Sequence, residues 1–115
     1  MELKGLNIMV LEEDTDPRST RIADSLALVI DKAAYVVYLG SEKITFPKKE
    51  FELLLLLATN PRKVFKRDEI LSSIWGPKYK AKDSRSLDVH IRMIRKKLHE
   101  EFITTVRGVG YRLEK

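Results

Sequence analysis

The 115-residue sequence contains no cysteine, and this absence excludes disulfide bonds and metal sites built on thiolates. It also lacks a long apolar run, because the longest aliphatic one, Leu53 to Ala58, is far shorter than the roughly 20 residues that a membrane-spanning helix needs. Neither a secretory signal nor an internal repeat is recognisable. These absences are typical of a protein in a reducing cytosol, so we expect a cytoplasmic protein that makes no contact with a membrane.

Residues that catalyse reactions or bind metals are also scarce. Only two histidines are present, His90 and His99, and without thiols they give little support to a zinc site. The acidic residues are scattered along the chain rather than gathered in a pattern typical of an active site. We therefore expect a protein that is not an enzyme and that holds no metal and no cofactor.

Positive charge is what the chain does have, and it is unevenly distributed. The formal net charge is +5. Residues 1–46 contain 5 basic and 8 acidic side chains, a net charge of −3, whereas residues 47–115 contain 17 basic and 9 acidic side chains, a net charge of +8. A chain of this length can bury a modest single core. The excess of cations in its second part indicates a polyanionic partner.

The segment 84–98 has the period of an amphipathic helix. Its apolar stripe consists of Leu87, Ile91, Ile94 and Leu98. The opposite side mixes cations with apolar groups: Arg85, Val89, Arg92, Met93 and Lys96. Asp88 is the only acidic residue of the segment and could pair with Arg92, and Asp83 or Ser84 could cap the helix. Since the major groove of DNA is about 12 Å wide and admits one helix, we predict a DNA-recognition helix here.

The other elements are expected to be short strands and two further helices. The strands expected in the first part of the chain are 6–11, 26–30, 35–39 and 42–46, of which the last three form an antiparallel meander. The helices expected are 48–59, the central buried helix, and 67–75, which Gly76 and Pro77 end. Val64 and Phe65 are expected to do no more than bridge these two helices. Strands at 102–106 and 111–113 flank the hairpin turn Arg107-Gly108-Val109-Gly110.

Together these elements predict an α+β fold. It is a winged helix-turn-helix with an N-terminal antiparallel β-sheet, a three-helix core and a C-terminal β-hairpin wing at 103–113. We expect this domain to span residues 20–115. Residues 1–19 are expected to form an N-terminal extension or linker.

Five stretches resemble, in order and in spacing, the C-terminal effector domain of OmpR/PhoB-type response regulators of bacterial two-component systems. They are Lys49–Leu54, Val64–Leu71, Ile74–Gly76, Arg85–Arg92 and Thr105–Arg112, and the resemblance covers about residues 26–113. It implies a four-stranded N-terminal sheet, a helix in the major groove and a wing at the minor groove. It also implies binding to direct repeats of double-stranded DNA as a head-to-tail dimer, contact with RNA polymerase, and regulation of transcription in a phosphorelay.

The chain departs from the family's pattern at several positions. Pro47 and Lys66 stand where members usually have a capping Ser or Thr, and each change removes a side-chain cap worth about 1 kcal/mol. Met93 stands where some relatives have an arginine that reads bases, and it offers only an apolar contact, for example to a thymine methyl group. Only Asn7–Asp14 faintly resembles the start of the family's receiver domain. We therefore expect a fragment of a response regulator, without phosphorylation chemistry.

Several residues of the predicted recognition helix are candidates for DNA contacts. Arg85, Arg92 and Lys96 are favoured as contacts to phosphates or base edges over a merely solvated face. Ser86 could donate to a phosphate near the start of the helix. Val89 could equally pack against the helix flank or contact a thymine.

Other candidates flank this helix. His90 could equally be a packed histidine or a phosphate contact, and Trp75 is a core residue whose indole N–H could reach a phosphate. Arg107, next to Gly108 in the hairpin turn, is favoured to enter a narrow minor groove rather than to remain an ordinary turn cation.

The resemblance adds further assignments. It favours a phosphate contact for Arg95 over an intramolecular ion pair. Thr105 and Tyr111 are similar to family contacts to a base and to the DNA backbone, although Tyr111 could simply be packed. The loop residues that correspond to the surface offered to RNA polymerase are Lys78, Tyr79, Lys80 and Lys82, although the composition of the loop fits a merely solvated loop equally well.

A winged helix that only docks other proteins is the alternative function. A cationic helix face would be unnecessary for that role. The two functions differ in their response to salt, because binding through about six phosphates gives a log–log slope near −5, whereas a docking interface depends little on salt.

Overall fold

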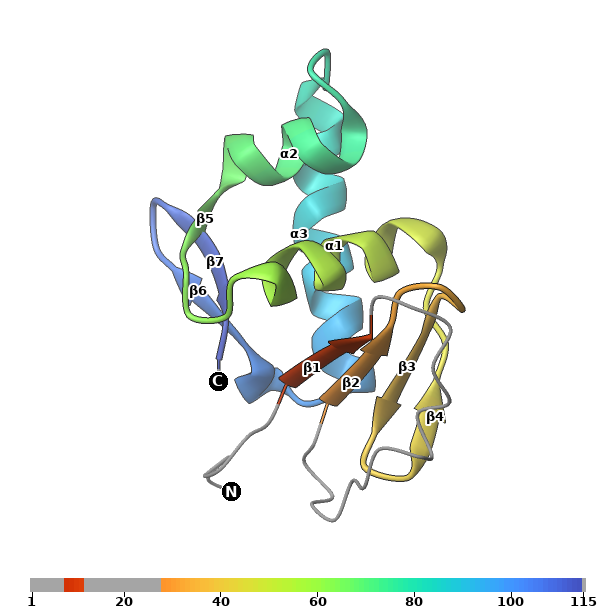
Figure 1. The fold of residues 1–115 in the computed structure, drawn as a ribbon. Coiled ribbons are helices and arrows are strands. Elements are labelled where there is room, and N and C mark those ends of the chain that lie inside the picture. Colours follow the sequence, from red (N-terminus) through yellow and green to blue (C-terminus); the bar gives the residue numbers. More distant parts are fainter. Residues whose placement is uncertain (1–7, 12–27, 115) are drawn as a thin grey trace.

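The computed structural model describes residues 8–11 and 28–114 (Figure 1). The strands of the first sheet are β1 (Ile8–Leu11), β2 (Leu28–Asp31), β3 (Val36–Leu39) and β4 (Glu42–Ile44). The helices are α1 (Lys48–Thr59), α2 (Arg67–Trp75) and α3 (Ala81–Lys97), and a 3₁₀ turn covers Glu100–Phe102. The strands of the second sheet are β5 (Phe65–Lys66), β6 (Ile103–Val106) and β7 (Gly110–Leu113). This is the predicted α+β winged helix-turn-helix.

The first sheet has the order β1-β2-β3-β4 and is mixed rather than wholly antiparallel. The antiparallel meander predicted for β2, β3 and β4 is confirmed. The prediction of an antiparallel sheet is wrong for β1, which pairs with β2 in parallel, Ile8 opposite Leu28. A parallel pair needs a connection of a dozen or more residues, and residues 12–27 are long enough to provide one.

β1 lies within the part of the chain that the sequence assigns to an N-terminal extension. Its pairing with β2 shows that residues 8–11 belong to the sheet. The remainder of the predicted extension lies outside the described residues, as do the expected first residues of the first two strands. The boundary at residue 20 stays a prediction.

Helix α1 is the central buried helix, as its almost continuous apolar sequence predicts. Phe51, Leu53, Leu54 and Leu57 are fully buried. The helix contacts β1, β7 and both other helices, and in Figure 1 it lies between the first sheet and α2. Pro47 precedes it without a side-chain cap, as expected. The core therefore surrounds α1 on several sides.

Helix α3 starts three residues earlier than the sequence predicts. The expected capping role of Asp83 or Ser84 is wrong, since the helix begins at Ala81. Asp83 instead stands in the first turn, where its carboxylate accepts a 2.7 Å hydrogen bond from the Lys80 N–H. Lys82 consequently belongs to the helix and not to the loop that was predicted to include it.

The wing is a three-stranded sheet of order β5-β7-β6. The hairpin of β6 and β7 is confirmed, but the segment regarded as a bridge forms β5, which pairs with β7. Gly110 makes this pairing possible, because a Cβ atom there would lie 1.9 Å from the carbonyl oxygen of Phe65. The wing is thereby joined to the segment that leads directly into α2.

Candidate nucleic-acid interface

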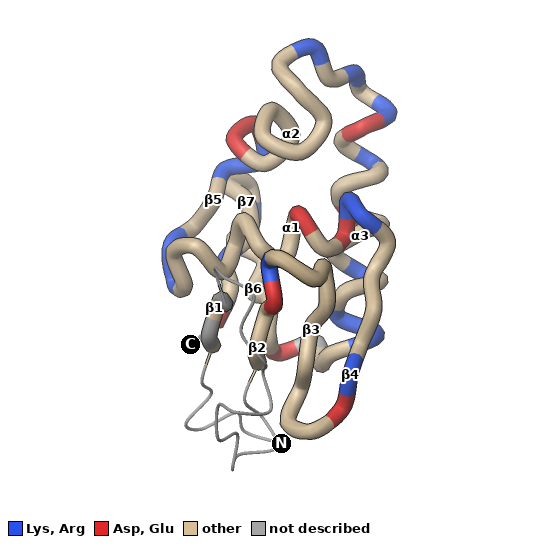
Figure 2. Tube along the Cα trace, turned by 45° about the vertical axis from the view of Figure 1, so that its right-hand side comes forward, with Lys and Arg blue, Asp and Glu red and all other residues tan. Residues whose placement is uncertain are grey.

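The outer face of α3 is open to solvent. Its exposed residues are Arg85, Val89, Arg92, Met93 and Lys96. Leu87, Ile91 and Ile94 occupy the buried side, as the helical period predicts. Figure 2 shows cations following one another along the loop before α3 and along the helix. The structure thus presents a row of exposed cations along α3 that is interrupted by exposed apolar side chains.

The wing lies beside this helix and is attached to it by Arg95. The Arg95 guanidinium donates to the carbonyl oxygen of Ile103, at 2.9 Å from Nη2, and to the Thr105 hydroxyl at 2.7 Å. Its Cζ atom lies 5.8 Å from the centre of the Tyr111 ring. Arg107 is exposed in the turn that follows β6. Helix α3 and the wing therefore form one continuous surface.

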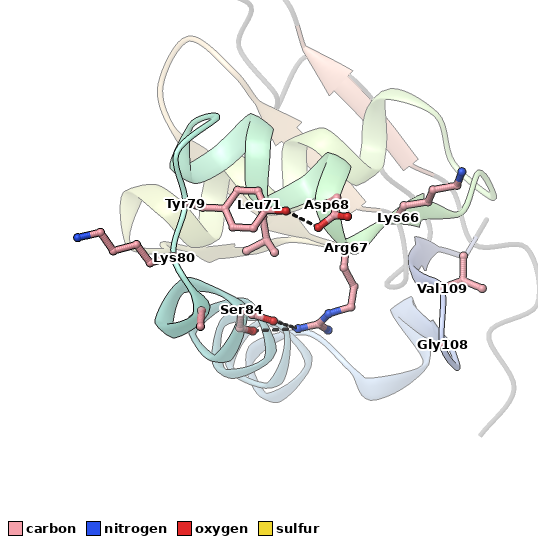
Figure 3. Close-up of a pocket in the computed structure, with 10 residues that line it drawn as sticks. Lys66, Arg67, Asp68, Leu71, Tyr79, Lys80, Ser84, Gly108 and Val109 are labelled. Carbon is pink, nitrogen blue, oxygen red and sulfur yellow. Dashed lines mark hydrogen bonds between the residues drawn. The ribbon is translucent and has the colours of Figure 1, made fainter.

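A second set of contacts joins α2, α3 and β7 around Asp88. Arg67 Nη1 donates to Asp88 Oδ1 at 2.7 Å, and the buried Tyr111 donates its hydroxyl to the same oxygen at 2.7 Å. Arg67 Nη2 also donates to the Ser84 hydroxyl at 2.6 Å, a contact visible in Figure 3. The predicted pairing of Asp88 with Arg92 is wrong, because Arg67 occupies the carboxylate. We call Arg67, Ser84, Asp88 and Tyr111 the Asp88 network.

The Asp88 network shifts the ionisation of its members. The hydrogen bond from Arg67 lowers the pKa of the Asp88 carboxyl below its ordinary value. Burial, together with donation to Asp88, raises the pKa of the Tyr111 phenol. The Asp88 carboxylate raises the pKa of the Arg67 guanidinium. The network is thus most stable with Asp88 ionised and Tyr111 neutral.

Replacing Asp88 with asparagine should change how stability depends on acid. The folded-state pKa of Asp88 is depressed, so its stabilising contribution is complete above the unfolded-state pKa of about 4. It is lost as the pH falls through the lower folded-state pKa. Asp88→Asn should therefore be less stable than the wild type at neutral pH and should lose less stability on acidification. Urea unfolding at several pH values measures this difference.

Tyr111→Phe is the matched control for this prediction. It keeps the buried ring and removes one of the hydrogen bonds to the carboxylate, so its acid dependence should lie between those of the wild type and Asp88→Asn. Parallel pH profiles for the wild type and Asp88→Asn would show that the network does not couple to stability.

Trp75 and His90 form a partly buried pair behind the exposed face. Their rings are stacked with centroids 5.4 Å apart. His90 Nδ1 is 4.0 Å from the buried carboxylate of Glu50, and Lys97 Nζ lies 3.9 Å from the same carboxylate. Both rings are half-buried rather than enclosed. The structure therefore gives His90 packed surroundings, and its phosphate contact stays a prediction.

The loop between α2 and α3 borders a hollow of about 530 Å³ near the tip of the wing (Figure 3). The Tyr79 hydroxyl donates to Asp68 of α2, and this bond raises the pKa of the phenol. Lys78 and Lys80 are exposed, whereas Tyr79 is half-buried. The predicted polymerase surface is thus cationic, with its one aromatic side chain attached to α2.

Three predicted DNA contacts already have partners within the domain, and one further residue was not predicted. Tyr111 is only 7% exposed, and Arg95 donates to the wing. Ser86 is half-buried and donates to the Lys82 carbonyl oxygen at 3.3 Å. Arg67 is the residue that was not predicted. Its side chain links α2 to α3, but its partner Asp88 lies 21 residues away in the sequence, so the residues next to Arg67 gave no sign of this contact.

Among residues 8–11 and 28–114, no group of three or more His, Cys, Asp or Glu side chains could hold a metal ion. No helix described in the structure is both long enough and apolar enough to cross a membrane.

Comparison with known proteins gives consistent matches. A model of the family described as "Transcriptional regulatory protein, C terminal" matches residues 41–113. The heme response regulator HssR of Staphylococcus epidermidis is 42% identical over 91 residues, which cover 76% of this chain and 40% of that protein. The chain therefore spans about 40% of the length of this curated relative.

Solved structures of DNA-binding domains match as well. The DNA-binding domain of Bacillus subtilis CssR is 32% identical, with a TM-score of 0.69 over 76% of this chain and 99% of that one. The Klebsiella pneumoniae RstA DNA-binding domain, solved in complex with the RstA box, is 36% identical, with a TM-score of 0.68 over 76% of this chain and 90% of that one.

Proposed function

This chain belongs to the family of C-terminal domains of transcriptional regulatory proteins, and we propose from this that it binds double-stranded DNA sequence-specifically as the output domain of a response regulator. The observation that carries the proposal is the exposed row of Arg85, Arg92 and Lys96 on α3, directly beside the wing. The RstA domain, 36% identical over 76% of this chain, was solved on its DNA box. The family is one of regulators rather than of enzymes, so we propose no catalytic role.

In the proposed complex, α3 lies in the major groove and the wing lies at the minor groove. The proposed contacts from exposed side chains are Arg85, Val89, Arg92, Met93, Lys96, Thr105 and Arg107. Half-buried Trp75 and His90 contribute hydrogen bonds to phosphates from the edge of this surface, and Ser86 does so when its hydroxyl rotates away from the Lys82 carbonyl oxygen. Arg95 and Tyr111 act on DNA chiefly by holding the wing against α3.

The proposed partners beyond a single duplex follow the family resemblance. The domain binds direct repeats as a head-to-tail dimer and contacts RNA polymerase through Lys78, Tyr79, Lys80 and Lys82. Lys78 and Lys80 in the loop and Lys82 at the start of α3 are exposed, and these cations support a polar contact rather than a hydrophobic one. The whole regulator acts in the cytoplasm.

Salt dependence tests the proposed function directly. Binding through about six phosphates should give a slope near −5 when the logarithm of the association constant is plotted against the logarithm of the salt concentration. Lys96→Ala should weaken specific and non-specific DNA alike and should reduce the magnitude of this slope by about one. Fluorescence anisotropy with labelled duplexes at several salt concentrations measures both quantities.

Lys43→Ala is the matched control, because Lys43 is exposed on β4 in the other sheet. It should leave the slope unchanged. A shallow slope for the wild type would favour the protein-docking function instead. A loss confined to one DNA sequence would contradict the assignment of Lys96 to a phosphate.

A further inference from the structure

Two apolar side chains stand in the middle of the cationic face of α3. Val89 is 44% exposed and Met93 is 36% exposed. The large hydrophobic residues exposed in the described part of the chain are Tyr35, Val89, Met93 and Val109. All except Tyr35 lie on α3 or at the tip of the wing. Exposed apolar groups that gather on one surface indicate a contact site.

The surroundings of Val89 and Met93 identify the kind of partner. Arg85 precedes Val89 by one helical turn, and Arg92 and Lys96 flank Met93. Within the described residues, the side chains of these three cations form no hydrogen bond and no ion pair. A partner that matches this surface must carry several negative charges, and it must place an apolar group between them. In the major groove of DNA, that group is the methyl of thymine.

We propose that Val89 and Met93 form a methyl-reading pair that selects two thymines in the major groove. This inference rests on the proposed function and specifies its DNA target. Residues four apart on a helix are about 6 Å apart along its axis, and base pairs follow one another at about 3.4 Å along the DNA axis, so the two thymines lie at most about two base pairs apart. The Met93 thioether lacks the donors that read guanine, so guanine is disfavoured opposite it.

Replacement of thymine by uracil removes only the methyl group and therefore tests the pair. A bound sequence is first selected from random duplexes, and each thymine in it is then replaced singly by uracil. At two of the thymine positions, a single replacement by uracil should weaken binding about fourfold. This factor corresponds to the burial of one methyl group. Met93→Ala should abolish the difference between thymine and uracil at one of these positions, and Val89→Ala at the other.

Matched variants separate methyl contact from general effects. Met93→Leu keeps an apolar side chain and should retain the thymine preference, whereas Met93→Arg should shift the preference at that position to guanine. Lys96→Ala should weaken thymine and uracil duplexes by the same factor. A 5-methylcytosine·guanine pair at either position should bind more tightly than unmethylated cytosine·guanine, because the 5-methyl group is shared with thymine.

The outcomes separate this inference from the proposed function. Steep salt dependence and sequence selection without any effect of uracil would overturn the methyl-reading pair and leave DNA binding in place. An effect of uracil that persists unchanged in both alanine variants would overturn it too, since other residues would then contact the methyl groups. Absence of selected sequences together with a shallow salt slope would refute the proposed function itself.

Discussion

Alanine in place of Gly110 is expected to lower the free energy of unfolding by about 3 kcal/mol. A Cβ atom there would lie 1.9 Å from the Phe65 carbonyl oxygen, which is backbone and cannot rotate away. Phe65 is held in place because it pairs with Tyr111 across β5 and β7. Relief of the clash would separate β5 from β7 and would displace the wing. Urea unfolding measures the loss of stability.

Gly108→Ala is the control for this substitution, because it isolates the effect of backbone conformation. Gly108 has a φ of +76° and no atom within 4 Å of an added Cβ, so alanine there meets only the left-handed penalty of about 1 kcal/mol. Equal stability losses for the two variants would show that the close approach at Gly110 relaxes without cost.

Alanine in place of Arg107 should weaken DNA binding about tenfold or more and should reduce the preference for A·T-rich flanks. Arg107 is exposed between β6 and Gly108, and the turn is closed by a 2.9 Å hydrogen bond from the Val109 N–H to the Val106 carbonyl oxygen. A cation held there can enter a narrow minor groove, whose negative potential is enhanced in A-tracts. Affinities for duplexes with A·T or G·C flanks measure both effects.

Arg107→Lys tests charge separately from shape. It keeps the positive charge but lacks the planar guanidinium, so it should recover part of the affinity and less of the flank preference. The folded state should be unaffected in both variants, because the side chain is exposed. Unchanged affinity and unchanged flank preference in Arg107→Ala would count against a minor-groove role.

The helices and the exposed face were predictable because they depend on local periodicity. The stripe of Leu87, Ile91 and Ile94 is buried, and the opposite face is exposed, as a period of 3.6 residues requires. The limits of α1 and α2 also agree with the sequence signals. The start of α3 was predicted wrongly because an acidic residue can cap a helix either from the cap position or from the first turn. Asp83 was expected at the cap position, but it accepts its hydrogen bond from within the first turn.

Contacts between distant segments were not predictable in the same way. The sequence offers Asp88 a neighbour at Arg92, one helical turn away, but the folded chain supplies Arg67 from α2 at 2.7 Å. The engagement of Arg95 with Ile103 and Thr105 likewise depends on where the wing packs. The pairing of strands also depends on distant segments. Phe65 and Lys66 form a strand only because β7 lies beside them.

The attachment of Arg95 to the wing has a consequence for the shape of the DNA. Because the Arg95 guanidinium joins α3 to β6, the position of this strand against the helix is set before any duplex arrives. In the proposed complex, any adjustment needed to meet both elements at once therefore falls on the double helix. Operators with easily deformed steps between the two contact points should therefore be preferred, even where no side chain reaches a base.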